Sequence, residues 1–276
     1  METQQMVTLS GKDFSRLKEF IYTQCGINIT DVKRTMLEAR LQKRLKMLSF
    51  SSFSLYCDYL FSREGMEDEL IQMIDVVTTN KTDFFREPEH FECLSKKALP
   101  ELFRKGGPRR VLSVWSAGCS SGEEPYTLAM VLKEFGCKFH ILATDISTRV
   151  LEKARLAIYE EEKVLPVPPE LKRKYLLKSK DPHKKIYRVI PELRESISFR
   201  RLNFMDGDFG FREHMDIIFC RNVIIYFDKP TQEKLLNKFC DYISPDGYIF
   251  MGHSESLFGM DVPLTQVVPT VYRRSA

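Results

Sequence analysis

The second half of the chain alternates between strand-like and helix-like segments, and this alternation constrains the fold more than any other feature of the sequence. From about residue 110 onward, short apolar runs precede segments with helical periodicity. Such alternation is typical of an α/β fold, in which helices cover a mostly parallel sheet. The strand-like runs are RVLSVW (110–115), KFHILATD (138–145), MDIIFCRN (215–222), GYIFMG (247–252) and TQVVPTVYRR (265–274).

The predicted helices between these strands cover residues 123–135, 146–159 and 228–243. The last of them has a good start signal, because Asp228 is a favourable N-cap and a proline is tolerated in the first turn. Residues 180–202 interrupt the alternation, since KIYRVI and SISFRRL have strand character and are joined across PELRE without a helix. We therefore expect a small antiparallel β insertion at about 180–202.

The first quarter of the chain differs, because it has helical periodicity and no strand pattern of comparable quality. Residues 13–74 are predicted to form a series of short helices, one of which carries a leucine stripe. We expect a small all-α domain at 1–75, a linker at 76–95 that contributes to a ligand site, and the α/β domain at 96–276. The leucine stripe consists of Leu37, Leu41, Leu45 and Leu48.

Basic residues gather beside this leucine stripe. Residues 32–48 contain six Lys or Arg against one acid, whereas acids predominate in residues 58–75. At 100° per residue, Lys33, Arg40 and Arg44 fall within about 40° of one another on a helix. These three residues form either the solvated flank of an amphipathic helix or a docking surface for an acidic partner, and the pattern alone leaves both open.

Composition argues against several classes of protein. The net charge of +4 is mild for a nucleic-acid binder, so we expect no nucleic-acid partner. No apolar run approaches the roughly 20 residues of a membrane span, and the first residues lack a signal-peptide pattern. Seven scattered cysteines without a C-x-x-C pair indicate free thiols in a reducing compartment, and five dispersed histidines give no support for a metal. We expect a cytoplasmic protein without a metal and without membrane insertion.

Polar residues occur where ligands bind in open α/β sheets, beyond the carboxyl ends of the strands. The first such loop, SAGCSSG (116–122), has small residues that let backbone N–H groups approach a ligand closely. Glu123 and Glu124 follow this loop and would repel a pyrophosphate. Asp145 ends the next strand and is placed to accept hydrogen bonds from both hydroxyls of a ribose. The other strand ends carry Asn203–Phe204 and Cys220–Asn222.

A positively charged nucleoside that needs no phosphate site would fit these residues, and S-adenosylmethionine is such a ligand. The alternative is that Glu123 and Glu124 only favour the N-terminus of the following helix through its macrodipole. The loop lacks the G-x-G-x-x-G pattern of dinucleotide sites. Taken by itself, the loop therefore leaves the identity of the cofactor open.

Further motifs are TTNKTDFFREPEHF (78–91), VWSAGCSSGEEPY (114–126), ATDIS (143–147), FCRNVIIYFD (219–228), PDGYIFMGHSES (245–256) and TVY (270–272). In this order and spacing, the six segments closely resemble the CheR family of chemotaxis receptor methyltransferases. They cover most of residues 76–273, and the helical first quarter also fits the domain arrangement of that family. Six ordered motifs make the resemblance specific, although no single one of them would.

The resemblance implies a class I S-adenosylmethionine-dependent methyltransferase domain of Rossmann-like fold, with a small β insertion and a preceding receptor-recognition domain. The implied activity is methyl transfer from S-adenosylmethionine to glutamate side chains of chemoreceptors, which forms methyl esters and S-adenosylhomocysteine for chemotactic adaptation. The implied partners are the cytoplasmic domains of the receptors. In some members the β insertion also docks a receptor's C-terminal pentapeptide by strand addition. We expect a monomer.

The resemblance also implies roles for individual residues. Arg86 and Tyr226 match residues that orient the accepting carboxylate. Lys33, Arg40 and Arg44 are expected to meet the acidic methylation helices of the receptor. We assign no role to His253 or Glu123. The residues that match cofactor contacts are Asn80, Thr82, Arg86, Glu124, Asp145, Asn203, Phe204, Cys220, Arg221 and Asn222.

The expected chemistry explains why no histidine–acid pair stands out. A glutamate with a pKa near 4.3 is already the nucleophile at neutral pH, so the enzyme needs no general base and must mainly align the reactants. Two other functions compete with this one. A nucleic-acid methyltransferase is disfavoured, because FCRNVIIY (219–226) has neither an Asn/Asp-Pro-Pro-Tyr/Phe motif nor a Pro-Cys pair. A docking module without turnover is disfavoured because Arg86, Asp145 and Tyr226 are all present.

Overall fold

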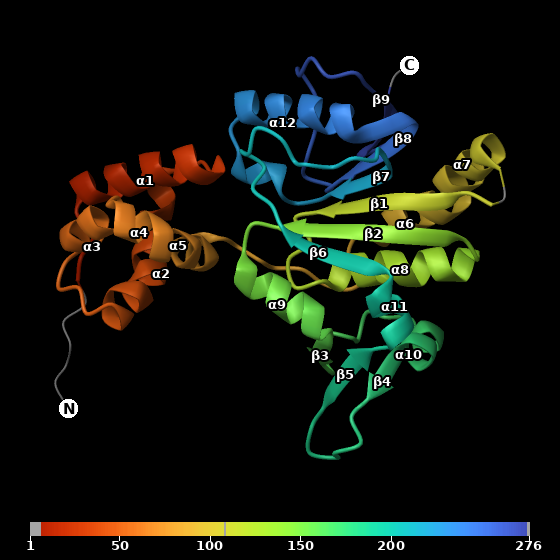
Figure 1. Ribbon diagram of the computed structural model, residues 1–276, viewed down its shortest axis with the longest axis horizontal. Coiled ribbons are helices and arrows are strands. Elements are labelled where there is room, and N and C mark those ends of the chain that lie inside the picture. The colour runs from red at the N-terminus through yellow and green to blue at the C-terminus, as the bar shows by residue number, and fades with distance from the viewer. Residues whose placement is uncertain (1–6, 108, 275–276) are drawn as a thin grey trace.

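The computed structural model describes residues 7–107 and 109–274, which form a helical N-terminal domain and an α/β domain (Figure 1). The helical character predicted for residues 13–74 is confirmed. Serine side chains begin several of these helices, because Ser10, Ser52 and Ser62 each accept a hydrogen bond from a backbone N–H three residues ahead. The elements are α1 (Gly11–Cys25), η1 (Asp31–Lys33), α2 (Arg34–Met47), α3 (Phe53–Leu60), α4 (Arg63–Asp68) and α5 (Leu70–Val77).

The leucine stripe of α2 lies in the core of the helical domain. Leu37, Leu41 and Leu45 are fully buried, and they belong to the same apolar cluster as Phe14 and Leu17 of α1. Leu48 is only partly buried, since it follows the last turn of α2. The amphipathic pattern of the sequence thus places the helix correctly against its neighbours.

Arg44 does not lie on an exposed basic face, and this part of the sequence prediction is corrected. Its side chain is buried, and its Nε donates to Oε1 of Glu69 at 2.8 Å. The Tyr56 hydroxyl donates to the same oxygen at 2.8 Å. The guanidinium therefore balances a buried acid inside the helical domain and is not available to an acidic partner. Glu69 lies in the acid-rich stretch 58–75. A helical wheel of α2 shows only residues of that helix, so it could not predict this partner.

The α/β domain is built on a seven-stranded sheet with the order β6-β2-β1-β7-β8-β10-β9. The first five strands of that order run parallel, and β10 lies antiparallel between β8 and β9. The predicted α/β fold with a mostly parallel sheet is confirmed. The strands are β1 (Val111–Ala117), β2 (Lys138–Asp145), β6 (Ile197–Arg201), β7 (Met215–Cys220), β8 (Ile243–Met251), β9 (Leu264–Val268) and β10 (Val271–Arg274).

Side chains of the central strands alternate between two apolar cores, one on each face of the sheet. Leu112 and Val114 of β1 point to the core that includes α7 and α8, whereas Trp115 points to the core beneath α12. Helices thus cover both faces, which explains why the strands are nearly continuous apolar runs. The helices of this domain include α6 (Pro88–Cys93), α7 (Leu99–Gly106), α8 (Glu123–Phe135), α9 (Thr148–Leu156) and α12 (Lys229–Tyr242).

The β insertion differs from the prediction in its extent. A three-stranded antiparallel sheet of order β3-β5-β4 projects from the domain below α9 (Figure 1). The segment SISFRRL does not belong to it, because β6 pairs in parallel with β2 at the edge of the main sheet. PELRE forms the short helix α11. The insertion comprises β3 (Ile158–Glu160), α10 (Pro169–Tyr175), β4 (Leu176–Lys178) and β5 (Ile186–Val189), and α11 is Pro191–Glu195.

The predicted helix at 146–159 is also too long. Helix α9 ends at Leu156, and Ala157 adopts a left-handed conformation with φ of 54°. This reversal of the backbone sends the chain directly into β3. None of the described helices is both long enough and apolar enough to cross a membrane.

The buried pair of Arg44 and Glu69 yields a test of stability. Replacing Arg44 with Ala leaves Glu69 buried without its cation, so we expect the free energy of unfolding to fall by about 3–5 kcal/mol. Urea denaturation followed by circular dichroism measures this loss. Lys43→Ala is the matched control, because Lys43 is its exposed neighbour on α2. Equal stability of both variants would contradict the assignment.

Candidate functional site

A cavity of about 410 Å³ opens at the carboxyl ends of the parallel strands, between the two domains. The loops after β1, β2, β6 and β7 form one wall of this cavity. The other wall comes from the helical domain, through residues that include Cys25, Ile29 and Lys33, and from segment 77–82, which begins with the last residue of α5. The cavity is therefore incomplete without the helical domain.

Most of the predicted site residues line this cavity. Cys220 does not, because its side chain is fully buried on the α12 face of β7. Arg40 lies just outside, where its guanidinium donates to the carbonyl of Val77 and to Thr79 Oγ1. The lining includes Lys33, Asn80, Thr82, Arg86, Glu124, Asp145, Asn203, Phe204, Arg221, Asn222 and Tyr226.

Asp145 occupies the floor of the cavity at the end of β2. Its carboxylate accepts hydrogen bonds from the backbone N–H groups of Ser120, at 2.8 Å, and Ser147, at 2.9 Å. Burial raises the pKa of this carboxyl above its usual range, against these hydrogen bonds. Because a carboxylate offers about four acceptor positions, Asp145 retains capacity for the hydroxyls of a ligand.

The two acids after the β1 loop have different surroundings. Glu124 lines the cavity, and its oxygens accept from the Ser116 hydroxyl at 2.7 Å and from Arg221 Nε at 2.8 Å. Glu123 is buried away from the cavity lining and accepts from the Ser121 hydroxyl at 2.7 Å. Burial raises the pKa of Glu123. Of the pair, Glu124 is thus the acid that a ligand in the cavity meets.

Arg221 connects the end of β7 to the linker between the domains. Its Nη1 donates to the carbonyl oxygen of Arg86 at 2.7 Å, and Nδ1 of His90 lies 3.1 Å away. The guanidinium also lies over the rings of Phe91 and Phe219, at 5.1 and 5.4 Å from their centroids. These contacts fix the position of Arg86 relative to the sheet.

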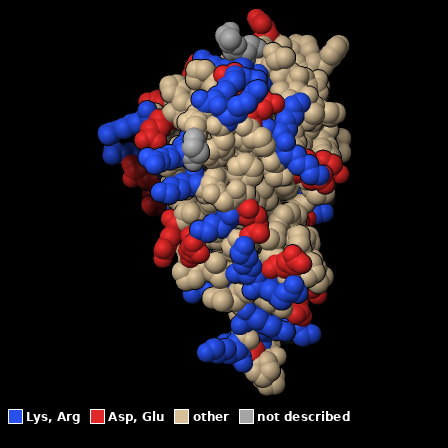
Figure 2. Space-filling model, turned by 90° about the vertical axis from the view of Figure 1, so that its right-hand side faces the viewer, with Lys and Arg blue, Asp and Glu red and all other residues tan. Residues whose placement is uncertain are grey.

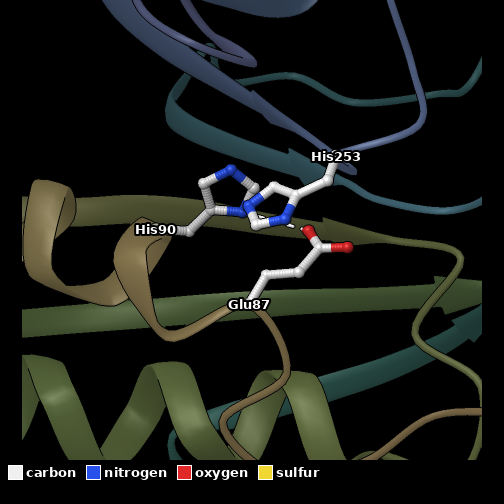
Figure 3. A group of neighbouring side chains, drawn as sticks. All are labelled: Glu87, His90 and His253. Carbon is white, nitrogen blue, oxygen red and sulfur yellow. Dashed lines mark ion pairs between the residues drawn. The ribbon is translucent and has the colours of Figure 1, made fainter.

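Glu87, His90 and His253 form a group whose possible metal-ligating atoms lie within 4.8 Å of one another (Figure 3). Arg221 Nη1, however, lies 3.1 Å from His90 Nδ1 and 3.6 Å from Glu87 Oε2. Burial, together with Arg221, lowers the pKa of His90 to about 4, so its ring is neutral. Nδ1 then accepts from Arg221 and Nε2 donates to Thr270 Oγ1 at 2.8 Å. A guanidinium thus already holds the cation position, and we assign no metal here.

Cationic and phenolic groups border the cavity on the side of the helical domain. Lys33 Nζ lies 5.7 Å from the centroid of the Tyr226 ring, and both residues line the cavity. Arg86, with a half-buried side chain, donates to the carbonyl of Lys81 at 3.3 Å. This border is suited to an anionic group of a second ligand.

Asn203 and Phe204 follow β6 on a third side of the cavity. The Asn203 side chain donates to the carbonyl of Gln24 at 2.6 Å and so joins the two domains. Phe204 packs against Trp115 and Phe239 with ring centroids 6.2 and 5.5 Å apart. The half-buried ring remains part of the cavity wall.

Sequence reasoning missed Glu255, which is buried beside the cavity. Its carboxylate accepts hydrogen bonds from the backbone N–H groups of Asn222, Val223 and Ile224, at 3.0, 2.9 and 3.0 Å. The signal in the sequence was an acid shortly after a strand, at the same sheet edge as the other site residues. His253 nearby has a side chain 52% exposed and is not one of the residues that line the cavity.

Each of the two domains matches a family model. Residues 12–78 match the family model of the all-alpha domain of CheR methyltransferases, and residues 80–272 match that of their S-adenosylmethionine-binding domain. The boundary between the two models falls within the predicted linker.

Curated relatives match along nearly the whole chain. A chemotaxis protein methyltransferase of Borreliella burgdorferi is 41% identical over 98% of this chain and 96% of its own length. Chemotaxis protein methyltransferase 2 of Pseudomonas aeruginosa is 38% identical over 95% of this chain and 92% of its own length. A chemotaxis protein methyltransferase of Escherichia coli is 37% identical over 100% of this chain and 95% of its own length. The chain therefore belongs to the CheR methyltransferase family and binds S-adenosylmethionine in its α/β domain.

Proposed function

We propose that this protein methylates glutamate side chains in the cytoplasmic domains of chemoreceptors, forming glutamate methyl esters and S-adenosylhomocysteine for chemotactic adaptation. Relatives named chemotaxis protein methyltransferase support a role in chemotaxis. The observation that carries the substrate class is the composition of one cavity. Glu124 and Asp145 line it together with Lys33, Arg86 and Tyr226, so a place for an anion adjoins a place for a cationic nucleoside.

The residues of the cavity fit the cofactor. Glu124 offers a carboxylate to the cationic methionine portion, and Asp145 has acceptor capacity for the ribose hydroxyls. Asn203 and Phe204 provide a polar and an aromatic contact for the base. Phosphate-binding cations are not needed for such a ligand, and the acids of this wall would disfavour a pyrophosphate.

S-adenosylmethionine supplies an electrophilic methyl group, so a carboxylate oxygen forms the new C–O bond while the C–S bond breaks and its electron pair stays on sulfur. No proton is transferred in this step, and the nucleophile is already ionised at neutral pH because a glutamate pKa is near 4.3. The protein's own groups therefore position the carboxylate. Near-attack positioning of this kind contributes up to about 7–11 kcal/mol to a reaction.

Arg86 and Tyr226 are the groups we propose for that positioning. A guanidinium presents a planar fork to a carboxylate, and a phenol adds one directed hydrogen bond. Arg86 is also engaged by the Lys81 carbonyl and lies 3.9 Å from Glu87 Oε1. Because Arg86 also interacts with these two groups, it neutralises the charge of the accepting carboxylate less than an exclusive ion pair would. The carboxylate thereby keeps its nucleophilicity.

The partner surface we propose is the helical domain next to the cavity. Lys33 and Arg40 lie there, and Val32 beside them is 93% exposed. A helix that carries acids and apolar residues would complement this surface. A second contact is proposed at the small sheet, where β3 and β4 are the outer strands and offer edges to an added peptide strand such as a receptor's C-terminal pentapeptide.

The surface charge gives no support to a nucleic-acid substrate. Figure 2 shows one face of the molecule, on which basic and acidic side chains are interspersed. Several lysines of the described surface are paired with acids, such as Lys174 with Glu134 and Lys163 with Asp83. A nucleic-acid substrate would favour a continuous basic stripe.

Methyl-labelled S-adenosylmethionine tests the proposed reaction. Receptor cytoplasmic fragments should acquire label that mild alkali releases as methanol, because the product is an ester. Fragments with and without their last five residues measure the contribution of the small sheet. Alkali-stable label in nucleic acid, or tight cofactor binding without any transfer, would contradict the proposed function.

Charge reversal at Lys33 tests the acceptor side. Lys33→Glu places a like charge where the acidic receptor segment is expected, so KM for the receptor should rise at least about tenfold, or about 1.4 kcal/mol. Cofactor affinity, measured by calorimetry, should change much less. Lys43→Glu is the control, because Lys43 is exposed on α2 and does not line the cavity. An unchanged KM would remove Lys33 from the receptor surface.

Replacement of Arg86 tests the position where both ligands meet. Arg86→Ala should reduce cofactor affinity or turnover at least about tenfold, since one charge-assisted contact is lost. Stopped-time methylation assays and equilibrium dialysis separate the two effects. Arg63→Ala serves as control, because the Arg63 side chain is 94% exposed and does not line the cavity. Identical kinetics for both variants would exclude Arg86 from the site.

A further inference from the structure

The loop that follows β7 presents three successive backbone N–H groups to one side chain. The N–H groups of Asn222, Val223 and Ile224 all donate to the carboxylate of Glu255, at 3.0, 2.9 and 3.0 Å. A fourth backbone donor to this carboxylate is Gly252. Glu255 is 4% exposed and is not part of the cavity lining. Its charge is thus satisfied by backbone groups.

The backbone conformation explains why these donors converge. Asn222 is left-handed, with φ of 59°, and Val223 is right-handed helical, with φ of −117° and ψ of −48°. Adjacent residues of opposite hand turn successive N–H groups toward one point and make an anion-binding concavity. Here the protein fills that concavity with its own carboxylate.

The same loop is packed closely between two other loops. A Cβ added at Gly118 would lie 2.5 Å from Val223 Cγ2, and one added at Gly252 would lie 2.8 Å from the backbone nitrogen of Asn222. The β1 loop and the loop after β8 therefore confine the segment from both sides. A non-glycine residue in the left-handed region is unfavourable by itself, so the conformation depends on such external contacts.

The functional importance of the loop follows from what it carries. Asn222, Val223, Ile225 and Tyr226 all line the cavity, within five residues of the chain. The carbonyl of Tyr226 accepts from the N–H of Asn28 at 2.8 Å, so the far end of the loop also touches the helical domain. A shift at 222–224 would displace groups on both the cofactor side and the acceptor side.

We propose that Glu255 is a positioning residue for methyl transfer, whose carboxylate holds the 222–226 loop in its active conformation. It acts through the backbone and touches neither the cofactor nor the acceptor. Asn222 and Val223 connect it to the cavity, in which we propose that the cofactor binds. Its connection to the acceptor through Tyr226 rests on the proposed function.

Chemical rescue provides a test that a general loss of stability cannot imitate. Glu255→Ala vacates the concavity, so turnover of the full-length enzyme should fall at least about tenfold. Formate, a small carboxylate, should restore a large part of the activity in a concentration-dependent way by occupying the vacated position. Formamide, similar in size but neutral, and sodium chloride at equal ionic strength should not restore it.

A matched variant separates positioning from folding. Asp216, like Glu255, is a buried carboxylate. It lies on β7 at the end of the strand opposite to the 222–226 loop, where it accepts from the Ser113 N–H at 3.0 Å. Asp216→Asn should lower the melting temperature and leave kcat near the wild-type value. Glu255→Gln, which keeps the shape, should lower kcat more than it lowers the melting temperature.

The outcomes discriminate between the possibilities. Loss of activity without rescue by formate, or a kcat of Glu255→Gln equal to that of wild type, would overturn the positioning role. If Glu255→Ala does not fold, the test is Glu255→Gln, for which the loss of kcat is compared with the loss of melting temperature. Cofactor affinity is measured in parallel by calorimetry, with and without formate. If the wild-type enzyme fails to methylate receptors, the proposed function alone is rejected. The calorimetric measurement of cofactor affinity then still tests the role of Glu255.

Discussion

The buried ion pair between Arg221 and Glu124 is the interaction on which the rest of the site depends. It joins the end of β7 to the first turn of α8, and Arg221 extends the connection to the linker through the carbonyl of Arg86. Both charges are buried, so each would be strongly unfavourable without the other. One guanidinium therefore sets the positions of Glu124 and of the Arg86 backbone, the residues that we propose to serve the cofactor and the acceptor.

Much of the fold and of the cavity could be predicted from local pattern. Strand ends in a parallel sheet meet at one edge, so the residues after β1, β2 and β7 were expected to lie together, and they do. The β insertion was harder, because whether SISFRR pairs with β2 or with a hairpin neighbour depends on long-range pairing. Strand β3 was hidden in the apparent continuation of α9, where the reversal at Ala157 has no strong sequence signal.

Errors in the site had a similar cause. The helical wheel placed Arg44 with Lys33 and Arg40, but the position of Glu69 on another helix decided its burial. Strand alternation turned Cys220 toward the α12 core. Glu255 was missed because its partners are backbone groups about thirty residues away. Local periodicity cannot identify such partners.

The helical domain forms part of the cavity wall, and this has a consequence for how such enzymes diversify. Asn203 donates to the Gln24 carbonyl, Thr148 donates to Asp75, and Asn28 donates to the Tyr226 carbonyl. Two of these hydrogen bonds between the domains are made by residues that line the cavity, Asn203 and Tyr226. A chimera that exchanged this domain for another would also exchange the part of the cavity wall that the domain supplies. Under the proposed function, mutations that adapt this domain to new receptors would also alter the cavity wall, so receptor preference and cofactor retention should drift together in evolution.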